Sequence, residues 1–141
     1  MAGARKIPFN AIWWESDYCF GKIADSHTDS MEIISFNEIK NDFEQVDMID
    51  GVVIITQYDV AWREDLFDGW HFYDLSQSME FKKAGYDIVV PKQDNIWCIH
   101  DSGVPLIKNG FEEYRKIFIE EYLTFYKSLN STVSIAFMEA K

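Results

Sequence analysis

Several features that would direct a first assignment are scarce in this sequence. The two cysteines, Cys19 and Cys98, are too few for a disulfide framework, although the count is compatible with one disulfide. Basic residues are also few: 13 Lys and Arg against 24 Asp and Glu give a net charge of −11, with no basic stripe. This charge argues against nucleic-acid binding as the main role.

Targeting signals and common cofactor motifs are also missing from the 141 residues. The sequence shows no basic-then-apolar leader and no apolar run of membrane-spanning length, so we expect a cytoplasmic protein without a transmembrane segment. It contains no nucleophile elbow, P-loop or dinucleotide glycine fingerprint. The length suits one domain with a sizeable core, and no internal repeat or boundary divides residues 1–141.

Aromatic residues, in contrast, are abundant: eleven Phe, seven Tyr and five Trp. Such a composition suits a dense core, and it equally suits stacking on sugars or bases. The aromatic content therefore does not discriminate between a structural and a binding role.

Alternating short apolar segments and one helical segment predict an α/β fold. The clearest predicted strand covers residues 46–56, because its run 52–55 is β-branched throughout, as in a strand buried on both faces. Further strands are predicted at 20–24, 31–36, 86–90 and 96–99.

Two helices are predicted from periodicity and end signals. In the first, over residues 75–84, Asp74 is the expected N-cap, Gln77 occupies the capping-box position and Gly85 is the left-handed residue after the helix. The second is a long aromatic C-terminal helix that we expect to begin at Asn109 and to pack on the sheet. Its apolar face is formed by Phe111, Tyr114, Phe118, Tyr122, Phe125 and Leu129.

Residues 69–100 contain the strongest candidates for chemistry. Asp74 is either a plain helix cap or a general base, which must be rigidly aimed, and His71 lies three residues earlier in an aromatic setting. His100 is either a strand-end residue bonded to a backbone carbonyl or a metal ligand, with Asp101 beside it. The Asp25-Ser26-His27 triplet has metal-ligand character, but we expect it in a polar loop and assign it no metal site.

A family pattern connects these pieces. Residues 69–74 read Gly-Trp-His-Phe-Tyr-Asp, the helix ends in Lys-Ala-Gly-Tyr at 83–86, and residues 97–101 read Trp-Cys-Ile-His-Asp. In this order, and after Asp50-Gly51, they resemble the C-terminal half of glycosyltransferase family 2-like proteins with the GT-A fold. The nearest likeness is to a bacterial group that carries both motifs. The resemblance implies a partial GT-A-type, Rossmann-like sheet with flanking helices.

The resemblance also implies functional roles. Asp74 would be the base in an inverting sugar transfer from a nucleotide sugar to a glycan acceptor, and His100 would bind Mn²⁺ or Mg²⁺. Trp70 and His71 would line a substrate pocket, where Trp13 and Trp14 either stack on a sugar or tuck against the core.

The sequence departs from the family pattern at the donor side. The Asp-x-Asp strand of the nucleotide-binding half has no counterpart here, so we expect an acceptor-side half that is inactive alone. We also expect it to self-associate through an exposed sheet edge or the C-terminal helix.

Two alternatives stay open. One is a non-catalytic glycan-binding or interaction module that uses Trp13, Trp14, Trp70 and Trp97. The other is an unrelated small α/β hydrolase or metal enzyme that uses His71, Asp74 and His100.

Overall fold

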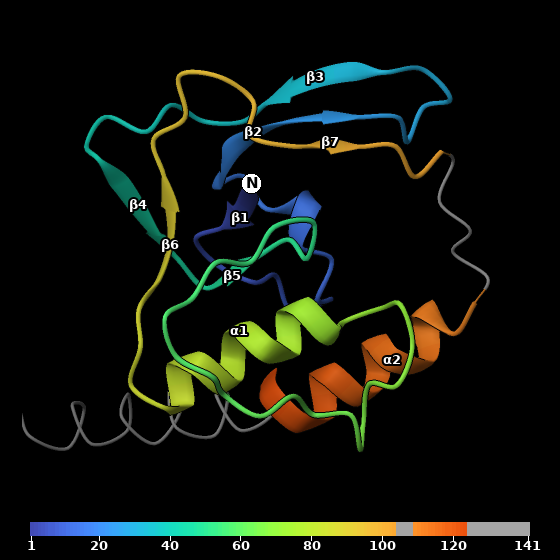
Figure 1. The fold of residues 1–141 in the computed structure, drawn as a ribbon. Coiled ribbons are helices and arrows are strands. Elements are labelled where there is room, and N and C mark those ends of the chain that lie inside the picture. Colours follow the sequence, from blue (N-terminus) through green and yellow to red (C-terminus); the bar gives the residue numbers. More distant parts are fainter. Residues whose placement is uncertain (104–108, 124–141) are drawn as a thin grey trace, which may run out of the picture.

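In the computed structural model, which describes residues 1–103 and 109–123, a layer of strands lies over two helices (Figure 1). The α/β class expected from the sequence is confirmed. The main sheet contains β1 (Ala2–Ala4), β2 (Cys19–Asp25), β3 (Glu32–Ser35), β5 (Met48–Ile49) and β7 (Ile99–His100). A second, two-stranded sheet pairs β4 (Phe43–Val46) with β6 (Ile88–Pro91).

The order β3-β2-β1-β5 describes the main sheet, and these neighbours are antiparallel. β7 pairs with β2 in parallel, beyond the segment of β2 that pairs with β1. In this register His100 lies directly opposite Asp25. A segment late in the chain is thereby placed against the end of an early strand.

The predicted strand over residues 46–56 is wrong for most of its length, because only β5 and the end of β4 are strands there. The Asp50 side chain accepts the N–H of Val52 at 3.0 Å, which is a local bond typical of a turn. The N–H of Gly51 is taken by the Asp74 carboxylate. These two side chains satisfy the donors that a longer strand would need, and the chain turns at Asp50.

Helix α1 (Tyr73–Lys83) begins two residues earlier than the predicted segment. The expectation that Asp74 is its N-cap is wrong: Phe72 holds that position in the left-handed conformation, without a side-chain cap. Gln77 likewise makes no capping box, since its amide donates to the carbonyl of Val60 at 2.7 Å. Gly85, at φ +88°, is the left-handed residue that was predicted after the helix.

Helix α2 (Phe111–Phe118) continues into a π-helical turn, Ile119–Leu123. Its N-cap is Gly110, so the predicted Asn109 cap is wrong. The apolar face is confirmed over the described part, where Phe111, Phe118 and Tyr122 are all buried. Phe125 and Leu129 lie outside the described residues, as does the length expected for this helix.

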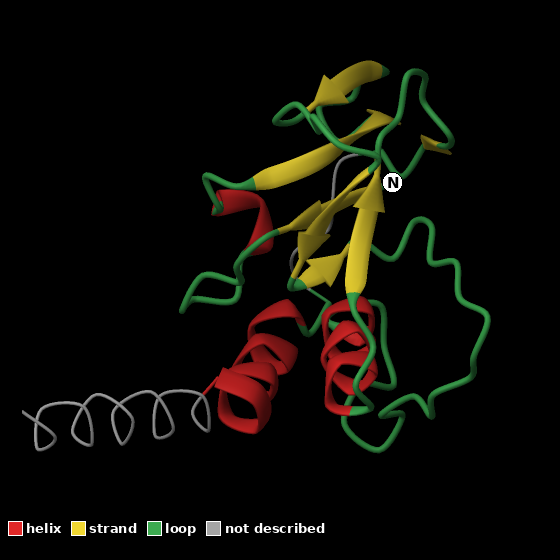
Figure 2. Ribbon diagram, turned by 90° about the vertical axis from the view of Figure 1, so that its left-hand side faces the viewer, coloured by secondary structure: helices red, strands yellow, loops and turns green. Residues whose placement is uncertain are grey.

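The two helices lie side by side beneath the strands (Figures 1 and 2). One core cluster joins both helices to β1 and β5 through Ala2, Ala4, Met48, Leu75, Met79, Phe118 and Tyr122. Burying these aromatic and aliphatic side chains supplies the main stabilisation of the layer contact. Across residues 1–103 and 109–123, no helix has the length and apolar character needed to cross a membrane.

Candidate functional site

Asp25, the last residue of β2, holds two histidines. Its Oδ2 lies 2.7 Å from Nδ1 of His100, and its Oδ1 lies 2.9 Å from Nδ1 of His27 and accepts the His27 backbone N–H at 2.7 Å. The Asp25 carboxylate is buried, whereas the two imidazole rings are 41% and 44% exposed. A buried anion therefore orients two rings that solvent and ligands can reach.

The charge state of Asp25 follows from these contacts. Burial raises its pKa, but the hydrogen bonds from His100 and His27 outweigh burial, so the pKa lies below the ordinary value. The ionised carboxylate accepts the Nδ1 protons, so a ring that carries one proton keeps its Nε2 atom as an acceptor. His100 is therefore presented in the tautomer that a metal ligand requires.

The sequence interpretation set Asp25 and His27 aside because it placed them in a polar loop. The structure brings them to His100, since β2 runs one residue further than predicted and pairs with β7. Only a prediction that these two segments pair in parallel would have placed Asp25 and His27 beside His100. Local periodicity contains no information about such a pairing.

Asp74 is held by two backbone donors at the start of α1. Oδ2 accepts the N–H of Gly51 at 2.9 Å, and Oδ1 accepts the N–H of Leu75 at 2.9 Å. Burial, together with the nearby charge of Asp50, raises the pKa of Asp74 to about 7 despite these hydrogen bonds. The carboxylate is thus rigidly aimed and titrates near neutral pH, as a general base requires.

Asp50 connects the two carboxylate groups of the site. Its pKa is raised, chiefly by burial, and the charge of Asp25 raises it further while that of His100 lowers it. Asp50 in turn raises the pKa of Asp74. Asp25, Asp50, Asp74 and His100 therefore lie within electrostatic reach of their neighbours, in one region of the molecule.

The aromatic candidates divide into three environments. Trp14 is 53% exposed and tilts against Phe111 at 6.0 Å, and His71 meets the same ring edge-on at 5.3 Å. Trp13 is buried, with its ring edge-to-face with Trp14 at 6.1 Å. Trp70 is 86% exposed. The structure thus gathers Trp14 and His71 around one ring, packs Trp13 into the core and leaves Trp70 in solvent.

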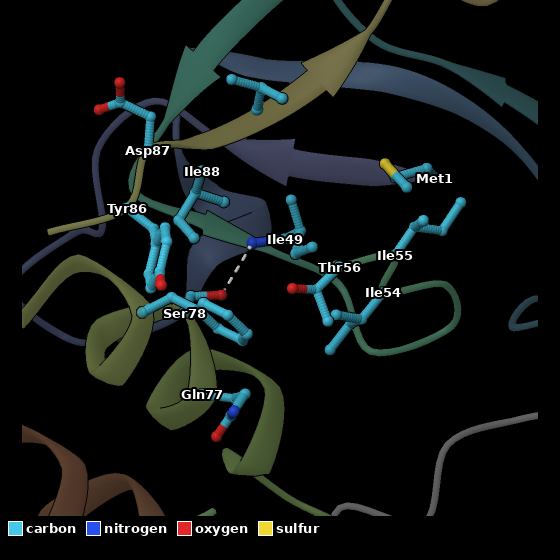
Figure 3. Close-up of a pocket in the computed structure, with 12 residues that line it drawn as sticks. Met1, Ile49, Ile54, Ile55, Thr56, Gln77, Ser78, Tyr86, Asp87 and Ile88 are labelled. Atoms are coloured by element: carbon cyan, nitrogen blue, oxygen red, sulfur yellow. Dashed lines mark hydrogen bonds between the residues drawn. The ribbon is translucent and has the colours of Figure 1, made fainter. Parts of the chain in front are cut away.

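A cavity of about 150 Å³ lies between α1, β6 and the loop after β5 (Figure 3). Figure 3 shows the N–H of Ile49 donating to the Ser78 hydroxyl, at 3.2 Å, on the wall of this cavity. Most of its lining is aliphatic or aromatic, and neither Asp74 nor His100 belongs to it. We assign it no part in the chemistry of the carboxylates.

A metal site needs several donor side chains that lie close together. Within the part of the chain that the structure describes, no group of three or more His, Cys, Asp or Glu side chains is placed to hold one. His100 fits as a single ligand, because Asp25 binds its Nδ1 and leaves Nε2 available. A complete coordination sphere would need donors in addition to these.

Taken together, the fold and the site define a mixed α/β protein with a rigidly held carboxylate suited to general-base chemistry. Residues 1–122 match the family described as "Glycosyltransferase like family", and the chain belongs to this family. The membership supports a glycosyltransferase-like function in general, and the mixed α/β architecture is consistent with a partial GT-A-type domain. No curated protein and no solved structure matches the chain.

Proposed function

We propose that this chain forms the acceptor side of an inverting glycosyltransferase, which transfers a sugar from a nucleoside diphosphate sugar to an acceptor hydroxyl. The observation that carries the proposal is the geometry of Asp74. Two backbone N–H groups fix its carboxylate, and burial with Asp50 brings its pKa to about 7. Each carboxylate oxygen keeps a further lone pair, which can accept the proton of a substrate hydroxyl.

The proposed reaction is a single displacement. The acceptor oxygen forms the new bond to the anomeric carbon while its proton passes to Asp74. The bond from the anomeric carbon to the diphosphate oxygen breaks, and the nucleoside diphosphate leaves with that electron pair. One base is enough for such an inversion, which agrees with the placement of a single carboxylate at the start of α1.

We also propose that His100 is a ligand for Mn²⁺ or Mg²⁺. Such an ion, when bound, neutralises the charge that develops on the departing diphosphate. The role of Asp25 is to hold the His100 ring through Nδ1 so that Nε2 faces the ion. His100 accounts for one position only, so the remaining ligands would come from the diphosphate and from residues beyond this pair.

The aromatic residues complete the proposed substrate side. His71 and Trp14, which share contacts with Phe111, would line the pocket for a sugar, and Trp70 is exposed enough to join them when substrate is present. Trp13 would act indirectly by supporting the Trp14 ring from the core. This assignment keeps all four residues of the predicted substrate pocket but gives them unequal parts.

Replacing Asp74 with Asn in a protein that carries this domain together with a donor-binding half tests the proposal. Loss of transfer by several orders of magnitude, with a preserved circular dichroism spectrum, is the expected result for a base. Substitution of the exposed Asp94 by Asn is the matched control and should leave transfer unchanged. Retention of most activity by the Asp74 variant would contradict the assignment.

We further propose that residues 1–141 alone bind nucleotide sugar weakly and do not transfer it, because the sequence contains no Asp-x-Asp. Isothermal titration with UDP and UDP-sugars in the presence of Mn²⁺ measures this. Affinity in the micromolar range would overturn the idea that the donor-binding half is required.

A glycan-binding module without catalysis is the second candidate, and the exposure of Trp70 and Trp97 favours it. Glycan binding that is indifferent to Mn²⁺ and to the Asp74→Asn substitution, together with no transfer when a donor-binding half is present, would support this candidate over an enzyme.

Self-association is also proposed. β3 lies at one edge of the main sheet, and Ile33 within it is 68% exposed, with Ile99 of β7 at 65%. An exposed apolar edge favours pairing with another strand. Light scattering at high protein concentration is the test, and a monomer there would count against self-association.

A further inference from the structure

A second cavity, of about 230 Å³, lies beside Tyr73, the first residue of α1. We propose that this cavity binds a neutral sugar unit of the acceptor, separated from Asp74 by the Tyr73 side chain. The proposal rests on the proposed function and deepens it, since it names the acceptor subsite and the charge class of its ligand. The cavity is lined by Trp62, Arg63, Glu64, Phe67, Tyr73 and Ser76.

Aromatic side chains form its walls. The Trp62 ring is 43% exposed and tilts at 39° to the ring of Tyr73, with centroids 6.1 Å apart. Phe67, which is buried, adds a third aromatic surface. Ligand pockets typically combine such apolar walls with a few placed polar groups, and a pyranose has an apolar C–H face that packs on an aromatic ring.

The hydroxyl of Ser76 lies at the buried end of the cavity, and its hydrogen-bond direction follows from the protons of its neighbours. Tyr122 donates its hydroxyl proton to the Glu80 carboxylate at 2.7 Å. Burial raises the pKa of Glu80, but hydrogen bonds from Lys83 and Tyr122 bring it below the ordinary value, so Glu80 is ionised and accepts. Ser76 must then donate to the Tyr122 oxygen, 2.8 Å away. Ser76 is only 1% exposed, so its hydroxyl completes the buried end of the cavity and is not open to a ligand.

The charges around the cavity select against anions. Arg63 is already engaged: Nε and Nη2 bind Asp65 at 2.8 and 2.9 Å, and Nη1 binds Glu121 at 2.8 Å. Glu64 has no hydrogen bond or ion pair with any residue in the described part of the chain. The exposed Glu64 therefore offers an acceptor and Arg63 is not a spare cation, which fits a hydroxyl-rich neutral ligand and repels a phosphate or carboxylate.

Tyr73 connects the cavity to the candidate base. Its ring forms a wall of the cavity, while its hydroxyl end approaches Gly51, whose N–H is bound by Asp74. Burial and then the charge of Asp74 raise the pKa of Tyr73. Asp74 does not line the cavity, so a sugar there is separated from the carboxylate by Tyr73, a position suited to an acceptor unit beside the reacting one.

Saturation-transfer NMR and isothermal titration of the chain with methyl glycosides test the proposal without any donor or metal. The probes are the methyl glycosides of glucose, galactose and rhamnose, and glucose 6-phosphate and glucuronic acid as anionic counterparts. We expect saturable binding of at least one neutral glycoside, binding of the anions at least tenfold weaker, and a further loss of at least tenfold in Trp62→Ala. Tyr58→Ala, an exposed aromatic substitution on the same loop outside the cavity, should bind like the parent chain.

The outcomes separate this inference from the proposed function. Glycoside binding that is absent, or that is unaffected by Trp62→Ala, overturns the subsite whatever the fate of Asp74. Binding that depends on Trp62 supports the subsite even if Asp74→Asn retains transfer, a result that would overturn only the base assignment. Glu64→Gln is the second variant: restored binding of glucuronic acid supports the charge argument, and unchanged selectivity against it contradicts that argument.

Discussion

The N–H of Gly51 donates to Oδ2 of Asp74 at 2.9 Å, which binds the turn after β5 to the first turn of α1. A side chain at position 51 would disturb this contact, because a Cβ there would lie 2.3 Å from the hydroxyl of Tyr73 and 2.7 Å from its Cζ. The absence of a side chain at Gly51 thus allows a phenol and a carboxylate to approach the same backbone position.

Gly51→Ala is therefore expected to destabilise the protein by about 1–3 kcal/mol, as overpacking does. Tyr73→Phe in the same chain should recover part of the loss, because it removes the nearest atom but not the ring. Urea unfolding of the two single variants and the double variant measures the coupling. Strictly additive effects would show that the Gly51–Tyr73 contact does not limit this position.

The pH dependence of transfer should report Asp74. A base must be ionised, so kcat/KM of a protein that carries this domain together with a donor-binding half should rise with pH and level off above a pKa of about 7. Asp50→Asn removes a negative charge that raises this pKa, and the rising limb should move to lower pH. Asp94→Asn is the control and should leave the pH profile unchanged. If Asp50→Asn does not shift the rising part of the profile, the electrostatic coupling between Asp50 and Asp74 is contradicted.

The free energy of unfolding should also depend on the ionisation of Asp74. The pKa of Asp74 is about 7 in the folded state and near 4 when unfolded, so the folded state holds the extra proton between these values. The stabilisation that comes from the proton on Asp74 is thus fully present below about pH 4. It is lost as the pH rises to 7, by at most about 1.4 kcal/mol per pH unit. The stability of wild type relative to Asp74→Asn, from urea unfolding, should fall across this window; a constant difference would contradict it.

Asp25 should show the opposite trend. Its folded pKa lies below the ordinary value, so its contribution is present above about pH 4 and is lost as the pH falls through the folded pKa. Asp25→Asn should therefore be less stable than wild type at neutral pH, and the gap should narrow in acid. Asp101→Asn, which changes an exposed neighbour of His100, is the control. A gap that does not narrow would show that the His100 and His27 contacts do not govern Asp25.

Tyr122→Phe is predicted to destabilise the fold by about 1–3 kcal/mol. The tyrosine is 1% exposed, and its hydroxyl bonds both Ser76 and Glu80, which would be left without that partner. Thermal or denaturant unfolding measures the loss. Tyr58→Phe provides the comparison, since that ring is 58% exposed, and equal effects of the two substitutions would contradict a structural role for the buried hydroxyl.

The sequence predicts best what is local. The left-handed residue after α1 and the apolar face of α2 follow from one glycine and from the spacing of aromatic residues, and both are confirmed at Gly85, Phe111, Phe118 and Tyr122. The strand predicted over 46–56 failed because two carboxylates, Asp50 and Asp74, satisfy backbone donors that β-branched propensity alone assigns to a sheet.

In the candidate site, too, local motifs identify some residues, whereas contacts between distant segments determine their environment. Asp74 and His100 were identified from motifs, but their environments depend on contacts that no local pattern contains. Asp50 raises the pKa of Asp74, and Asp25 orients the ring of His100, and both pairs lie far apart in the sequence. The aromatic cavity was missed for the same reason, because Trp62 and Tyr73 meet only after the loop folds back onto α1.

The parallel pairing of β7 with β2 has a consequence for how the protein acquires its site. Asp25 and His100 are 75 positions apart, so their contact closes a long loop, and the entropy of that closure must be offset by contacts formed elsewhere. Non-local pairings of this kind form slowly. A chain in which this pairing has not formed lacks an oriented His100, whatever the state of helix α1. The chemical shift of the His100 ring therefore reports when this pairing forms.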